Sequence, residues 1–93
     1  MANRVIRKII DYERIYNGKK TAKTAFAMAM RYYAGYAVSH RHDFLHKAAA
    51  VLAPYAGSPD VGVGFLRAHI ACEMGNIDQA EGIIAAMGLY ARR

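Results

Sequence analysis

The sequence predicts an all-α fold of about five short antiparallel helices, and three observations lead to this prediction. Alanine supplies much of the 55% of hydrophobic residues, and alanine favours helices and close packing between them. Apolar residues recur at the three- and four-residue spacing of a helix face in several segments. Links of about two to five residues separate these segments, so consecutive helices are expected to be antiparallel neighbours.

The 93 residues are expected to form a single all-helical domain, residues 1–93, with a modest core. It divides into a basic N-terminal helix at 3–17, core helices within 21–56 and a helical hairpin at 58–88. The one cysteine, Cys72, cannot form an internal disulfide, which favours a reducing, cytoplasmic location. No membrane span is predicted, because no apolar run approaches the roughly 20 residues that cross a bilayer.

The first predicted helix is amphipathic, with a basic outer face and Ile10 among its inward residues. Asn3 is predicted to cap it. Asn17-Gly18 ends it, with Gly18 suited to the left-handed conformation that follows many helices. Asn-Gly is also the strongest short hairpin signal, so a β-hairpin across these two residues remains the alternative.

Residues 21–38 form the most apolar stretch and are predicted to be a central helix capped by Thr21. Its inward stripe is predicted to hold Phe26, Ala29, Met30, Tyr33, Tyr36 and Ala37. Further apolar residues widen this stripe almost around the helix. We therefore expect a shared wall, with the first helix on one side and the third and fourth helices on the other.

The third and fourth helices are bounded by recognisable start and stop residues. Asp43 is predicted to cap the third helix, which ends near Pro54. Residues 58–60 are Ser-Pro-Asp, the preferred residues for a cap and a first turn, and predict the start of the fourth. Gly62 and Gly64 are expected to allow the backbone of another segment to approach the fourth helix closely. The predicted inward residues of the fourth helix are Val61, Phe65, Ala68, His69 or Ile70, and Cys72.

The last two helices carry small residues at a spacing that lets antiparallel helices pack closely. Gly75 supplies the turn, and the final helix covers residues 77–87, with Gly88 as its end and Ile77 among its inward residues. This pattern resembles a tetratricopeptide unit, although Gly64 replaces the usual early aromatic. The resemblance rests on Ala68, Ala71, Gly75, Ala80 and Ile84.

A looser copy of this unit covers the central and third helices, with Tyr32, Ala48 and Leu52 matching and Tyr36 and Asp43 departing from the pattern. Two such units behind an extra helix resemble the small needle-subunit chaperones of type III secretion, which cradle an aggregation-prone helical partner. The resemblance implies a non-enzymatic chaperone or adaptor that works as a homo- or hetero-oligomer.

One group of methionine and tyrosine side chains is predicted to bind a partner, because methionine repacks easily and tyrosine is favoured at interfaces. The alternative is that the same side chains form the core. The group consists of Met28, Met30, Tyr32, Tyr33 and Tyr36.

Positive charge is concentrated in the first half of the chain. Residues 1–47 hold ten basic and three acidic residues, whereas residues 48–93 hold three and four. This imbalance predicts an acidic partner for the first half: nucleic acid, lipid headgroups or an acidic protein. The candidate contacts are Arg4, Arg7, Lys8, Arg14, Lys19, Lys20, Lys23 and Arg31, with Tyr12, Tyr16, Tyr32 and Tyr33 available to stack on bases. The alternative is that these cations line solvated helix faces.

The sequence predicts no catalytic residue, metal or cofactor. His42 and His46 have the spacing of zinc ligands on a helix, but no cysteine pair completes a site. His69 and Cys72 have the spacing of a thiolate–imidazole pair, but no third group is placed to orient them. A helix-binding module is therefore the first hypothesis. The alternatives are a basic DNA- or RNA-associated protein and a phage-encoded inhibitor that docks on a host complex.

Overall fold

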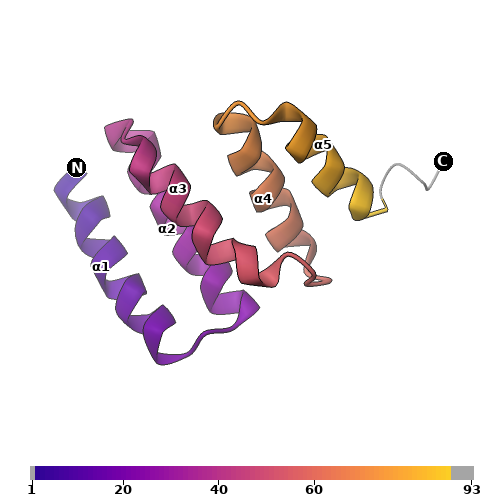
Figure 1. Ribbon diagram of the computed structural model, residues 1–93. Coiled ribbons are helices and arrows are strands. Elements are labelled where there is room, and N and C mark those ends of the chain that lie inside the picture. The colour runs from indigo at the N-terminus through magenta and orange to yellow at the C-terminus, as the bar shows by residue number, and fades with distance from the viewer. Residues whose placement is uncertain (1, 89–93) are drawn as a thin grey trace.

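Residues 2–88 fold into five α-helices that follow one another across the molecule (Figure 1). The computed structural model describes residues 2–88, with side chains from residue 8 onward. The helices are α1 Ala2–Gly18, α2 Ala22–Ser39, α3 His42–Leu52, α4 Val61–Glu73 and α5 Ile77–Ala86, with a 3-10 turn at Ala53–Tyr55. Consecutive helices run in opposite directions. No strand occurs in the described residues, so the all-α prediction is confirmed.

Helix α2 lies at the centre of the array and packs on α1, α3 and α4. Gly35 is the closest point of this packing, because a Cβ there would lie 2.9 Å from Ile9 Cδ1 and 3.1 Å from Phe44 Cδ2. The absence of a side chain at Gly35 lets Ile9 of α1 and Phe44 of α3 approach the same point of α2. The predicted contacts of the central helix with the first, third and fourth helices are confirmed.

The core has two parts. The main cluster joins side chains from α1 to α4, and its largest fully buried members are Met28, Leu45, Leu52, Val63 and Ile70. A smaller cluster between α4 and α5 consists of Ala68, Ala71 and Ala80, with Ile83 and Ile84 packed against it. Its small side chains hold α5 close to α4, as the residue spacing predicts.

The inward face of α2 differs from the predicted stripe. The buried residues are Ala25, Met28, Ala29, Tyr32 and Gly35, whereas Met30 and Ala37 are exposed. Because α2 is apolar on almost every side, its sequence pattern does not determine which side faces the core. The contacts with neighbouring helices determine the orientation of α2 instead. These are the close approach of other side chains to Gly35 and the stacking of Tyr32 on Phe44, whose ring centroids are 6.4 Å apart.

Helix α4 is rotated relative to its prediction as well. Val63, Leu66 and Ile70 are buried, and Phe65 is exposed; Val61, His69 and Cys72 are exposed too. The physical reason is that α4 packs on α2 and α3 along one side and on α5 along another, which leaves a third side outward. Ile10 in α1 and Ile77 in α5 were also predicted inward, and both are exposed.

Several helix boundaries differ from the predicted ones. Helix α1 begins at Ala2, so Asn3 lies inside it, and α1 continues through Asn17-Gly18, which excludes the β-hairpin. Gly18 does not adopt the left-handed conformation. That conformation occurs at His40, which ends α2 with φ 59° and whose backbone N–H donates to the Tyr36 carbonyl.

The start signals of α3 and α4 also act differently from their predictions. Arg41 rather than Asp43 occupies the cap position of α3. Asp60 rather than Ser58 caps α4, because its carboxylate accepts a 2.8 Å hydrogen bond from the Gly62 backbone N–H.

Other boundary predictions are confirmed. Thr21 and Thr24 form a reciprocal capping box at the start of α2. Gly75 and Gly88 have φ of 84° and 79°, as their roles after α4 and α5 require.

Candidate partner-binding surfaces

Helices α2 and α4 run in the same direction and meet along one seam (Figure 1). At one end, the Phe26 ring lies against Gly62, where a Cβ would be 3.3 Å from Phe26 Cε1. Two turns further on, Tyr33 Oη and His69 Nε2 are joined by a 2.7 Å hydrogen bond. Both contacts join residues 36 positions apart, so the two helices keep one register along the seam.

Two large apolar side chains are exposed beside this seam. Met30 is 43% exposed and Phe65 is 46% exposed. Met30 lies four residues after Phe26, and Phe65 lies three residues after Gly62, so each shares a helix face with its seam contact. We call Met30, Tyr33, Phe65 and His69 the α2–α4 face.

Tyrosine and histidine rings extend this face toward the end of α2. The Tyr33 ring lies edge-on to His69, with centroids 5.0 Å apart, and 6.1 Å from Tyr36. Tyr36 in turn lies 5.5 Å from His42 and 6.4 Å from His40. Burial raises the pKa of Tyr33, with smaller contributions from Glu73 and Tyr36. Tyr33 is therefore uncharged over the physiological pH range, and the cluster presents mixed polar and aromatic groups.

The predicted partner-binding group is divided by the fold. Met28 is 1% exposed and Tyr32 is 7% exposed, so both belong to the core and are not available to a partner. Met30, Tyr33 and Tyr36 lie on or next to the α2–α4 face. Phe65 belongs to this face and was predicted to be buried.

The sequence holds a pattern that is compatible with an outward Phe65. Val63, Leu66 and Ile70 follow the i, i+3, i+7 pattern of a core stripe in α4, and Phe65 falls outside it. The competing stripe through Val61 and Phe65 contains residues that are just as apolar, so the pattern alone does not choose between them.

The buried Tyr32 connects α2 to α1. Its hydroxyl donates a 2.6 Å hydrogen bond to Glu13 Oε2. Burial is the main cause that raises the pKa of Tyr32, and the Glu13 carboxylate raises it further. Nearby, the Arg31 guanidinium lies 4.6 Å from the centre of the Tyr12 ring and donates to its hydroxyl at 3.2 Å. These polar groups stabilise the α1–α2 packing.

The predicted basic contacts are exposed on α1 and around its turn into α2, except for the half-buried Arg31. The exposed ones are Lys8, Arg14, Lys19, Lys20 and Lys23, and the side chains of Arg4 and Arg7 lie outside the described residues. Three of the four tyrosines that were predicted to stack on bases have ring faces that are not available for stacking. Tyr32 is buried, and Arg31 and Lys20 cover the rings of Tyr12 and Tyr16.

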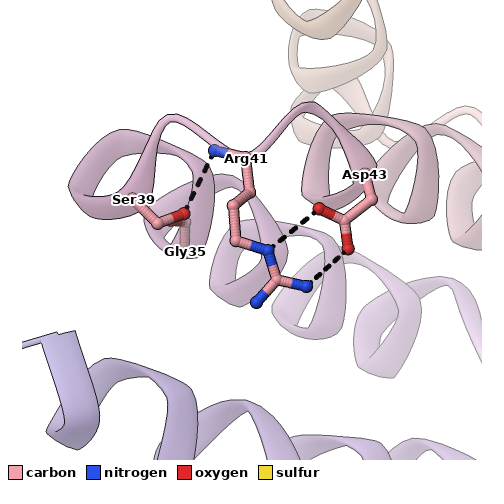
Figure 2. A network of polar contacts seen from close by, with 4 residues as sticks. All are labelled: Gly35, Ser39, Arg41 and Asp43. Atoms are coloured by element: carbon pink, nitrogen blue, oxygen red, sulfur yellow. Dashed lines mark hydrogen bonds and ion pairs between the residues drawn. The ribbon is translucent and has the colours of Figure 1, made fainter.

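The α2–α3 turn is held by a polar network (Figure 2). Arg41 donates to both carboxylate oxygens of Asp43, at 3.2 and 2.9 Å, and this is the only ion pair among residues 8–88. The Arg41 backbone N–H donates to Ser39 Oγ, which donates to the Gly35 carbonyl at 2.6 Å. The Arg41 hydrogen bond is the main cause that lowers the pKa of Asp43.

The histidine and cysteine candidates are not gathered into a reactive site. Asp43, the acid beside His42 and His46, is paired with Arg41, and in the described part of the chain no three His, Cys, Asp or Glu side chains are placed to share a metal ion. His69 bonds to Tyr33, and Cys72 is exposed. The polar contacts of these residues are therefore with neighbouring side chains of the surface, such as that of His69 with Tyr33.

A groove of about 330 Å³ opens between α3, α4 and α5. Ala49 and Ala50 of α3 and Ala53 of the following 3-10 turn form its α3 side, Ile70 belongs to its α4 wall and Ile83 to its α5 side. Arg67, Gln79, Ala71 and Met74 complete the lining. The groove is thus apolar with a single charged side chain. No sequence pattern indicated it, because its lining comes from three helices.

Within residues 2–88, none of the helices has the length and apolar character needed to cross a lipid bilayer. Comparison with protein-family models, curated proteins and solved structures found no significant match to the chain.

Proposed function

We propose that this protein is a non-enzymatic protein-binding module, a small chaperone or adaptor that receives a helix of a partner protein on its α2–α4 face. The observation that supports the proposal is the exposure of Met30 on α2 and Phe65 on α4, each on the helix face that carries a contact of the seam. Exposed apolar side chains bordered by tyrosine and histidine are typical of protein interfaces.

The arrangement of the helices supports the same proposal. Repeat proteins built from helical hairpins bind partners along rows of parallel helices, and α2 and α4 form such a row. A partner helix laid along the seam would cover the exposed parts of Met30 and Phe65 together. Homo- or hetero-oligomers and a role like that of the needle-subunit chaperones belong to this proposal. So does a reducing, cytoplasmic location, since Cys72 is an exposed thiol.

A photo-crosslinking amino acid placed at Met30 or Phe65 tests this function in cells of the native host. We expect the same protein adduct from both positions. Ile15 on α1 is the matched control, because it is 55% exposed and remote from the seam. Adducts of equal yield at Ile15, or a monodisperse unbound monomer with no adduct at either seam position, would contradict the proposal.

Nucleic-acid binding is the second candidate. The observation that favours it is the group of exposed cations at 14–23, none of which forms an ion pair within the described residues. Binding of this kind weakens steeply with salt through counterion release. A gel shift at about 50 mM salt that disappears at higher salt would support it, and its absence at that low salt would exclude it. A phage inhibitor docking on an acidic host surface would use the same cations and give no gel shift.

A further inference from the structure

We infer that the groove between α3, α4 and α5 is a second binding site, which accepts an amphipathic helix carrying one carboxylate on its apolar face. Arg67 is the residue that would pair with this carboxylate. This inference goes beyond the proposed function, because it assigns a different surface and a charge requirement to a further partner. Two such surfaces would make the protein an adaptor.

The groove and the α2–α4 face lie on different sides of α4. At about 100° per residue, the groove residues Arg67, Ile70 and Met74 are centred roughly 150° away from Phe65 and His69. A helix bound in the groove would therefore leave the seam accessible. The two sites can be separated by mutation.

The walls of the groove suit a helix. Three alanines on the α3 side each project a single carbon, so a partner helix can approach α3 closely. Its apolar side would meet Met74 and Ile83, which are only half-buried. Helix α5 contributes only Ala80 to the fully buried core, so its groove-facing side is available for a neighbour.

Arg67 determines the charge of the occupant. It is half-buried in an apolar wall, and no carboxylate of the described residues lies within 4.0 Å of it. A guanidinium without an acidic neighbour can bind a carboxylate through two parallel hydrogen bonds. Gln79 is the other polar group of the lining and adds a neutral hydrogen-bond partner.

The surrounding charges argue against a polyanion. The acids Asp78 and Glu81 are exposed on α5, and residues 48–93 carry a net charge of −1. A nucleic acid or a strongly acidic peptide would be repelled there. A largely apolar helix with one central Asp or Glu satisfies Arg67 and avoids that repulsion.

Three fluorescent helical peptides of about 18 residues test the inference; they share an apolar face and differ only in one central residue, Glu, Gln or Lys. Fluorescence anisotropy with the whole protein is expected to show about tenfold tighter binding of the Glu peptide than of the Lys peptide. The variant Arg67→Glu is expected to reverse this order. Arg14→Glu, an exposed site on α1, is the charge-matched control and is expected to preserve it.

A second pair of variants locates the bound peptide. Ala50→Trp places a large side chain at the exposed edge of the groove and is expected to abolish binding, whereas Phe65→Glu is expected to leave it intact. Circular dichroism establishes that each variant is folded. Equal affinities for the three peptides, no binding of any, or sensitivity to Phe65→Glu in place of Ala50→Trp would overturn the inference. The last result would still support the proposed function at the α2–α4 face.

Discussion

The hydroxyl of Tyr32 donates a 2.6 Å hydrogen bond to the carboxylate of Glu13, and this bond joins the buried side of α2 to the preceding helix. Tyr32 also stacks on Phe44 of α3. One side chain therefore connects three helices. Tyr32, which was predicted from the sequence to bind a partner, therefore has a structural role.

We predict that Tyr32→Phe lowers the free energy of unfolding by about 1–3 kcal/mol, since it removes a hydrogen bond to a charged group. Urea denaturation monitored by circular dichroism measures the change. Tyr36→Phe is the control, because the Tyr36 hydroxyl has no hydrogen-bond partner among residues 8–88, and its change is expected to stay within about 0.5 kcal/mol. Equal losses in the two variants would refute the role of the Glu13 bond.

Stability is predicted to fall in alkali. Burial raises the pKa of Tyr32, Tyr16 and Tyr33 in the folded state. The folded chain thus retains these protons above the ordinary tyrosine pKa of about 10, where the unfolded chain releases them. The stabilisation is complete below about pH 10 and is lost as the pH rises further. Denaturation midpoints from pH 8 to 11 should show this decline, and a shallower one for Tyr32→Phe; a decline that begins well below pH 9 would need another cause.

Gly35→Ala is predicted to destabilise the protein by about 1–3 kcal/mol, because the new methyl group overlaps Ile9 and Phe44. This loss occurs although alanine is the better helix former. The matched control is Gly82→Ala in α5, where nothing lies within 4 Å of the added Cβ. There the helix propensity acts alone and is expected to add about 0.5–1 kcal/mol. Thermal melts measure whether Gly35→Ala lowers and Gly82→Ala raises the stability of the fold. Stabilisation by Gly35→Ala would contradict the close packing around Gly35.

Met28 and Met30 provide a test of the orientation of α2. Met28→Ala is predicted to cost about 2–5 kcal/mol, because the side chain is fully buried. Met30→Ala is predicted to change stability by less than about 0.5 kcal/mol, because Met30 lies on the exposed side. Chemical denaturation of the pair measures both. A larger cost at Met30 would mean that the predicted stripe, rather than the observed one, faces the core.

Asp43 is predicted to titrate below its ordinary carboxyl pKa of about 3.8, because the Arg41 guanidinium stabilises its charged form. The stability linked to this pair is present above that value and is lost as the pH falls through the lowered pKa of Asp43. Carbon-detected NMR titration of the side-chain carboxyl measures it. Arg41→Ala should return the pKa toward 3.8, whereas Arg67→Ala should leave it unchanged.

The candidate surfaces could be predicted only in part. Exposure of Lys8 and Arg14 on α1 follows from the charged face that the sequence of this helix predicts. Met30 and Tyr33 were found because methionine and tyrosine are common at interfaces, but the same reasoning selected the buried Met28 and Tyr32. The groove around Arg67 could not be predicted, because three helices separated along the chain form it.

By itself, the sequence determined the helical class, the glycine turns at Gly75 and Gly88, the cap at Thr21 and the close packing of α4 on α5 through alanines. These features depend on a residue's own backbone preference or on neighbours three and four positions away. The tertiary structure decided which sides of α2 and α4 face inward and hence which apolar residues are exposed. The physical reason is that both helices are apolar on several sides, so their rotation depends on contacts between distant residues, such as Gly35 with Ile9 and Phe44.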